Sequence, residues 1–429
     1  MFGPSSRRIS TWRTVGRSIW AVDYPAAMAI DTKVGGVTDE ELNSLREYLE
    51  ASLPDYMADL ELLVNIDCGS YTKAGVDEVG RWMVDQLAEL GAAVSIEANS
   101  ELGDIVVGEL DGAGSSRALL IGHLDTVFSE GTVAERPFMI RDGRAYGPGV
   151  DDMKGGLLGG LYALRAIRAL HPAGTPASEW LPFRRLVFVA NPDEEVGSPT
   201  SIPVIRREAE GASFALVLES ARENGDIVSA RKGIADFVIH IAGRAAHAGV
   251  EPDKGRSATV EAAHKTVALT ALNGRWPGVT VNVGVVRGGT RANVIAEKAE
   301  LEVDIRGRTA AEMEAAEAAV REICETTTVP DVVTTVTRRN FWPPMEKSPG
   351  TAALAEEAIS IAARLGFELR DAATGGASDA NTTSAMGVPT LDGLGPVGGA
   401  DHAPGEYLEI DSIVPRTTVI AALLLGAER

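Results

Sequence analysis

The chain has 429 residues, more than one hydrophobic core usually serves, and its apolar (45%) and charged (24%) fractions are those of a globular protein. Its formal net charge of −21 argues against nucleic acid and an anionic membrane surface as partners. Two cysteines, Cys68 and Cys324, are too few and too far apart for a disulfide framework, which fits a reducing compartment. We therefore expect two domains, with no nucleic acid and no membrane among the partners.

Residues 1–36 are predicted to form a disordered N-terminal extension. They contain Arg7-Arg8 and Ala27-Met28-Ala29, which resemble parts of a twin-arginine export signal. Charged residues and a proline interrupt the apolar segment that such a signal needs. We expect a cytoplasmic protein. The alternatives are an exported protein and a start codon placed too early, with Met28 as the true start.

Helices and strands alternate through most of the remaining chain. Thr38, followed three residues later by Glu41, is a capping-box signal, and apolar residues at helical spacing follow it. We expect further helices at about 56–65, 76–90, 157–170, 203–208, 349–365 and 411–425. Strands are expected at 94–96, 104–109, 118–121, 185–190 and 214–218, with a hairpin turn at Asp142-Gly143-Arg144. This order predicts an α/β fold with a mostly parallel sheet and helices on both faces.

The pattern changes after about residue 231. Strands are expected at 234–242, 279–286, 294–305 and 332–337, and helices at 255–272 and 309–326. The resulting order, β-α-β-β-α-β, is the ferredoxin-like arrangement. Residues 338–344 are expected to form the linker that leads back. We therefore expect one domain made of residues 37–231 and 340–429, with a smaller α+β domain, residues 232–339, inserted into it.

Polar residues of metal-binding and acid–base type follow the predicted strands of the larger domain. The clearest case is the run from Ala118 to Thr126, where a short apolar strand ends in His123 and Asp125, two residues that point to the same side of an extended backbone. Open α/β sheets bind ligands at this edge. The full set is His123, Asp125, Asp152, Glu194, Glu195, Glu219 and His402. Each alone fits an ordinary polar turn, but two imidazoles with several carboxylates suit zinc.

Six segments, taken together, resemble one enzyme family. They are GHLDT, YGPGVDDMKGG, NPDEEVGS, the strand end at Glu219, GRAAHAG and DHAPGEY. In this order they resemble the dizinc metallopeptidases that include glutamate carboxypeptidase, aminoacylase, acetylornithine deacetylase and succinyl-diaminopimelate desuccinylase, from about Leu45 to the C-terminus. The motifs are most similar to those of glutamate carboxypeptidase. The resemblance implies a zinc-exopeptidase-like sheet with an inserted ferredoxin-like dimerisation, or lid, domain.

The resemblance also implies a ligand set for two Zn²⁺ ions per subunit, for which Co²⁺ or Mn²⁺ could substitute. It assigns His123 and Glu219 to one ion, Glu195 and His402 to the other, and Asp152 to both. Asp152 is chosen over Asp151 because the family's bridging aspartate lies two residues before a lysine, here Lys154. Since a cis peptide bond commonly follows this aspartate in the family, Asp152–Met153 is a candidate for one.

Three residues are implied to act in catalysis. Glu194 would be the general base, and Asp125 would orient His123. His247, in the turn Ala245-Ala-His-Ala-Gly249, would stabilise the oxyanion in the partner subunit's site. An ordinary surface histidine is the alternative. The inserted domain would form the homodimer by extending its sheet edge to edge.

Arg306, Asn293 and Gly376 match positions that contact the substrate in the family. A guanidinium suits bidentate binding of a carboxylate, although Arg306 could instead form a structural ion pair with Asp304. Glutamate carboxypeptidase has an arginine just before a proline in the return linker, where this chain has Phe341-Trp342-Pro343-Pro344. That departure puts glutamate specificity in doubt and permits an aromatic or apolar acyl group.

The predicted activity is zinc-dependent hydrolysis of an amide bond next to a free carboxylate. The substrate would be a small or dipeptide-like molecule, and the enzyme a carboxypeptidase releasing C-terminal glutamate or a related amino acid. The first alternative is an N-acyl amino acid deacylase of the acetylornithine deacetylase or succinyl-diaminopimelate desuccinylase type. A non-catalytic binding protein on the same fold is a more remote alternative.

Overall fold

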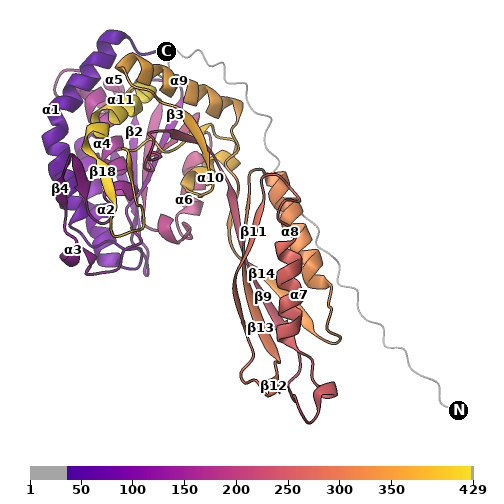
Figure 1. The fold of residues 1–429 in the computed structure, drawn as a ribbon. Helices are drawn as coiled ribbons and strands as arrows, with labels where there is room; N and C mark the ends of the chain where they lie inside the picture. Colours follow the sequence, from indigo (N-terminus) through magenta and orange to yellow (C-terminus); the bar gives the residue numbers. More distant parts are fainter. Residues whose placement is uncertain (1–35, 427–429) are drawn as a thin grey trace.

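The computed structural model describes residues 36–426, so nearly all of the predicted N-terminal extension lies outside the described residues. Figure 1 shows two units: a larger α/β unit, built from both ends of the chain, and an elongated inserted unit between β9 and β14. No helix within residues 36–426 combines the length and apolar character that a membrane span needs.

A six-stranded sheet lies at the centre of the larger unit. Its order is β1 (Ala93–Glu97), β2 (Ile105–Asp111), β6 (Arg185–Asn191), β3 (Arg117–His123), β7 (Phe214–Val217) and β16 (Thr390–Leu391). The pairs from β6 to β16 are parallel, whereas β2 pairs antiparallel with both of its neighbours, β1 and β6. The expected mostly parallel sheet is therefore present, with an antiparallel edge.

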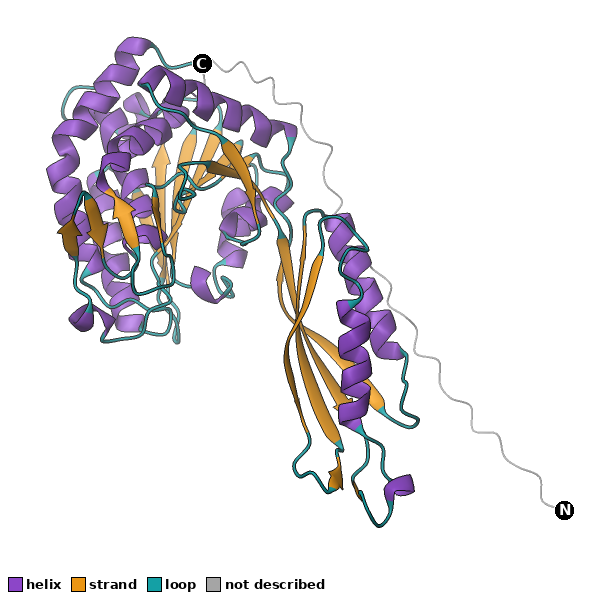
Figure 2. Ribbon diagram, in the orientation of Figure 1, coloured by secondary structure: helices purple, strands orange, loops and turns teal. Residues whose placement is uncertain are grey.

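Helices cover both faces of this sheet (Figure 2). Along β3, Ala118 and Leu120 belong to one apolar core, while Leu119 and Ile121 belong to the other. The first face carries α1 (Asp39–Val64), α2 (Lys73–Glu89), α4 (Gly156–Ala169), α9 (Pro349–Leu365) and α11 (Ile410–Gly426). The second carries α6 (Ile202–Ala209) and α10 (Asp379–Ala385). Burial on both faces explains why these strands are continuously apolar.

Helix α1 differs from the expectation of two separate helices. It runs unbroken for 26 residues from the capping box at Thr38, with Pro54 inside it. A proline removes one helical hydrogen bond. Leu49, Tyr56 and Leu60 nevertheless keep the same face buried across that position, and this packing explains the continuous helix.

Shorter elements complete the larger unit. The hairpin predicted at Asp142-Gly143 joins β4 (Met139–Arg141) to β5 (Arg144–Tyr146), and both turn residues have positive φ, as a type I′ turn requires. The other short elements are α3 (Thr132–Glu135), α5 (Ala177–Trp180), β8 (Ile227–Arg231), β15 (Asp371–Thr374), β17 (Gly398–Gly399) and β18 (Tyr407–Glu409).

The inserted unit has the ferredoxin-like order. Its antiparallel sheet runs β11 (Thr280–Gly288), β13 (Lys298–Gly307), β9 (Gly233–Ala242) and β14 (Val333–Trp342). Helices α7 (Ala258–Thr270) and α8 (Ala310–Glu325) pack on one face against alternate strand residues such as Phe237, Ile239 and Leu301. The other face is rich in polar and charged residues.

Two expectations for this unit were wrong in detail. The strand expected at 294–305 is split into β12 (Val294–Ile295), which pairs with β10 (Ala246–His247), and β13. Most of the segment expected as a linker is strand, because β14 continues its ladder with β9 as far as Trp342 opposite Ile234. The chain then leaves through Pro343 and Pro344, and Met345 forms two main-chain hydrogen bonds with Arg231, at the start of the unit.

Candidate metal centre

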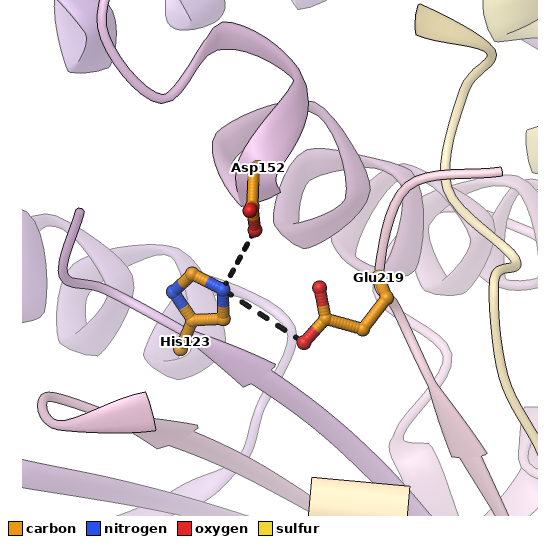
Figure 3. A group of neighbouring side chains, drawn as sticks. All are labelled: His123, Asp152 and Glu219. Carbon is orange, nitrogen blue, oxygen red and sulfur yellow. Dashed lines mark hydrogen bonds and ion pairs between the residues drawn. The ribbon is translucent and has the colours of Figure 1, made fainter. Parts of the chain in front are cut away.

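Three side chains converge at the carboxyl edge of the central sheet. His123 ends β3, Glu219 follows β7, and Asp152 lies in the turn that leads into α4. Figure 3 shows these side chains pointing toward one another. His123 Nε2 is 3.1 Å from Asp152 Oδ1 and 3.8 Å from Glu219 Oε1. Parallel strands bring residues that are far apart in the sequence to one edge.

A second group of three shares Asp152 with the first. His402 Nε2 lies 3.0 Å from Asp152 Oδ2 and 3.2 Å from Glu195 Oε2. In each group the candidate ligand atoms all lie within 4.8 Å of one another. One oxygen of Asp152 therefore faces each group.

Asp152 lies at an irregular point of the backbone, held by Glu406. The Asp152–Met153 peptide bond is cis, as the resemblance implies, and Asp152 has non-helical dihedral angles. The Glu406 carboxylate accepts main-chain N–H bonds from Gly149, Asp151 and Asp152 at 2.9–3.1 Å. Burial raises the pKa of Glu406 to about 7. Sequence reasoning did not assign Glu406 a role, although it lies in the DHAPGEY segment.

His123 is oriented by the segment that follows it. Its Nδ1 lies 2.9 Å from the Asp125 carbonyl, so Nδ1–H donates there and Nε2 keeps a lone pair for the centre. The Asp125 side chain accepts from Ser70 Oγ at 2.6 Å and from the N–H groups of Glu194 and Glu195. Asp125 thus links the end of β3 to the loop that carries Glu194 and Glu195. No motif predicted a role for Ser70.

The centre has an excess of negative charge. Burial, followed by the charge of Glu219, raises the pKa of Glu194 well above its ordinary value, and burial does the same for Glu219. Hydrogen bonds to Asp152 and Glu195 raise the pKa of His402 to about 10. Within residues 36–426, the buried Glu195 Oε1 has no hydrogen-bond partner. Divalent cations would relieve this crowding, and the imidazole and carboxylate donors fit zinc.

Two buried aspartates support the loop that carries Glu194 and Glu195. Asp193 accepts from Thr200 N and Oγ1 at 2.7 and 2.6 Å. Asp379, at the start of α10, accepts from Ser198 Oγ at 2.6 Å and from Asn191 Nδ2. Burial raises the pKa of Asp379 to about 7. Its partners Ser198 and Asn191 are distant in the sequence, and near Asp379 only Gly376 was predicted as a site residue.

The other predicted substrate and oxyanion residues are not members of the two groups. Arg306, in β13, makes both the ion pair with Asp304 (3.2 Å) and a hydrogen bond to the Gly375 carbonyl (2.8 Å). The Gly376 carbonyl accepts from Arg231 Nη1 at 3.3 Å. His247 and Asn293 are neighbours through β10 and β12, at the end of the inserted unit remote from the larger unit (Figure 1).

The sequence of this chain matches that of a known enzyme family. Residues 119–426 match the profile of peptidase family M20/M25/M40. Carboxypeptidase G2 of Pseudomonas sp. (strain RS-16) is 30% identical over 97% of this chain and 98% of its own. The chain belongs to peptidase family M20. It is therefore a hydrolytic metalloenzyme.

Other M20 relatives carry different names. Acetylornithine deacetylase of Proteus mirabilis is 29% identical over 60% of this chain and 68% of its own. Succinyl-diaminopimelate desuccinylase of Dechloromonas aromatica is 27% identical over 84% and 95%. Aminopeptidase PepT of Bacillus cereus has the same fold, with a TM-score of 0.70 at 22% identity over 92% of this chain and all of its own.

Proposed function

We propose that this M20 enzyme hydrolyses an amide bond next to a free carboxylate, as a carboxypeptidase that releases C-terminal glutamate or a related amino acid. The nearly full-length similarity to carboxypeptidase G2 supports this activity. The observation that most supports a two-metal site is the position of Asp152. Its two carboxylate oxygens lie 3.1 Å from His123 Nε2 and 3.0 Å from His402 Nε2.

The two groups of side chains would hold two Zn²⁺ ions. His123 and Glu219 would bind one ion, Glu195 and His402 the other, with Asp152 between them. Bound zinc lowers the pKa of a water molecule and polarises a carbonyl. Asp125 fixes His123 through the Nδ1–H bond, so that Nε2 stays available as a ligand.

Glu194 would move the proton. Burial, followed by the charge of Glu219, raises the pKa of Glu194, which suits a general base that takes a proton from the attacking water. The same carboxyl group can then protonate the leaving amine. The loop is held by Asp125, through the N–H groups of Glu194 and Glu195, and by Asp379. A fixed loop keeps the base in reach of the scissile bond.

His247 would complete the site of a second subunit. It is exposed and lies at the end of the inserted unit remote from its own metal centre (Figure 1). In a homodimer formed through the inserted units, it could donate a hydrogen bond to the developing oxyanion. Exposed valines on this unit, Val267 in α7 and Val333 in β14, provide apolar surface for such contact.

The substrate's free carboxylate would bind near Asn293, Arg306 and Gly376. Arg306 already reaches the larger unit, since it bonds the Gly375 carbonyl beside Gly376. The Arg306 side chain is 37% exposed, which leaves room for a carboxylate.

An N-acyl amino acid deacylase is the second candidate. The return segment has Asn340 paired with Asp236 and then aromatic residues, where glutamate carboxypeptidase has an arginine before a proline. The Trp342 ring lies beside Gly197, two residues after Glu195, so it borders the loop that carries Glu194 and Glu195. The similarity to acetylornithine deacetylase and succinyl-diaminopimelate desuccinylase also supports this candidate.

A substrate panel tests the proposal. Zinc-loaded enzyme would be assayed on dipeptides and folate-like compounds with C-terminal glutamate, and on N-acetyl and N-succinyl amino acids. Higher kcat/KM on the first set supports the carboxypeptidase, and higher kcat/KM on the second supports the deacylase. Glu194→Gln should lower kcat by about 10²–10⁴ with bound metal unchanged. Unchanged hydrolysis in this variant would refute the proposal.

A further inference from the structure

The histidine at the tip of the inserted unit has one well-defined hydrogen bond. The main-chain N–H of Gly249 donates to His247 Nδ1 at 3.2 Å. Within residues 36–426 the ring has no other hydrogen-bond partner, and the side chain is exposed. In a neutral imidazole one nitrogen carries the proton and the other accepts. A ring whose Nδ1 accepts must therefore carry its proton on Nε2.

The backbone around this bond is fixed from several sides. The His247 carbonyl accepts from the N–H groups of Val250 and Glu251, at 3.2 and 3.0 Å. The Ala248 N–H donates to the Asn293 carbonyl at 3.0 Å, and His247 pairs with Val294 across β10 and β12. The turn therefore holds the Gly249 N–H in place against the ring.

His123 shows the opposite arrangement in the same chain. Its Nδ1 faces the Asp125 carbonyl, which can only accept, so Nδ1 carries the proton and Nε2 presents a lone pair. A carbonyl beside Nδ1 leaves Nε2 with the lone pair that a metal ligand needs, whereas an N–H beside Nδ1 leaves Nε2 protonated as a hydrogen-bond donor.

We infer that Gly249 is a positioning residue: its N–H holds His247 as the Nε2–H tautomer and fixes the ring plane, so that Nε2–H is aimed outward as a donor. This inference rests on the proposed role of His247 in the partner's site. It adds the atom that donates and the group that selects it. A donor fixed before substrate binds costs no reorganisation during the reaction.

Nuclear magnetic resonance of the zinc-loaded, ¹⁵N- and ²H-labelled enzyme tests the hydrogen bond directly, at a pH where His247 is neutral. We expect a scalar coupling between the Gly249 amide nitrogen and His247 Nδ1, and a proton on Nε2. The His247→Ala variant assigns the signals by removing them. A proton on Nδ1, or no coupling to Gly249, would overturn the inference.

Two substitutions at Gly249 separate the N–H from the side chain. Gly249→Ala keeps the N–H, and its Cβ would lie 3.7 Å from His247 Cε1, an ordinary contact. Gly249→Pro removes the N–H. We expect the alanine variant to keep the coupling and the proline variant to lose it. The kcat of the proline variant should be at least about fivefold below that of the alanine variant, and the loss should not exceed the roughly 10²–10³-fold cost of removing an oxyanion donor altogether.

The comparison counts if the proline variant keeps the wild-type melting temperature, zinc content and dimeric state. If it does not, the coupling in the wild-type enzyme decides alone. Equal kcat in the two folded variants would contradict the inference. His247→Ala isolates the proposed function: if it leaves kcat unchanged, the oxyanion role fails, whether or not the coupling is seen.

Discussion

At the residue scale, the strand-end residues could be predicted because their signal is local. A buried strand followed by His123 and Asp125 needs no knowledge of the rest of the fold. Glu406 and Ser70 could not be predicted, because their roles depend on tertiary hydrogen bonds to Asp152 N and Asp125 Oδ2. The loop that carries Glu194 is likewise held by Asp379, which bonds Ser198 from 181 residues further along the chain.

Asp379→Asn should lower kcat by about 10–100-fold while bound zinc stays unchanged, because a small misplacement of a catalytic group costs this much. The new amide N–H₂ would face Ser198 Oγ–H or Asn191 Nδ2–H, both of which now donate to Asp379. The measurement is kcat together with zinc analysis. Asp85→Asn, at an exposed position on α2, is the matched control. Loss of zinc in step with kcat would contradict a role confined to the loop.

At the element scale, the hydrophobic period predicted whether a segment is a helix or a strand. Where each element ends depends on the elements that pack or pair with it. Residues 338–342 resemble a linker in isolation, yet β9 extends the ladder through them. Pro54 suggests a helix break, yet the buried face of α1 continues past it. In α7, Glu261 and Lys265 are almost completely buried, 3.1 Å apart. The period alone predicts apolar residues at such positions.

Glu261→Gln should destabilise the protein by roughly 3 kcal/mol, because it leaves the buried Lys265 without its counter-charge. Burial raises the pKa of Glu261, but the Val329 N–H, Lys265 and the Thr328 N–H outweigh it and hold the pKa below its ordinary value. The unfolded chain therefore binds a proton first as the pH falls. The stabilisation is complete above that ordinary value and is lost as the pH falls through the folded-state pKa.

Denaturant unfolding of the wild type and the variant, at several values between roughly pH 6 and pH 3, measures this dependence. The stability difference should shrink as the pH falls. Glu314→Gln, at an exposed position in α8, is the control and should show little change at any pH. If the difference in unfolding free energy between the wild type and Glu261→Gln stays constant or grows toward low pH, the ion pair is not its cause.

At the scale of the whole molecule, the sequence order predicted an inserted unit, but not where its tip lies. The ladder of β10 and β12 places His247 at the end remote from the metal centre of the same chain (Figure 1). The hydrophobic periodicity of the sequence does not predict how far His247 lies from the metal centre. This separation supports the proposal that each active site takes its histidine from a second subunit.

Mixed dimers test that proposal. Glu194→Gln and His247→Ala should each be nearly inactive alone. After the two are unfolded and refolded together, or coexpressed, half of the dimers contain one of each, and one of their two sites has both residues. The mixture should then recover about a quarter of wild-type activity per site. No recovery, in a mixture shown to contain heterodimers, would place His247 in the site of its own chain or outside catalysis.

The proposed metal centre holds two cations at one edge of the sheet, with Asp152 between them. Anomalous diffraction from zinc-loaded crystals, collected on either side of the zinc absorption edge, measures this most directly. We predict two peaks about 3.5–4 Å apart, one beside His123 and Glu219 and the other beside His402 and Glu195, with an Asp152 oxygen on each. A single peak, or zinc bound away from Asp152, would contradict the account.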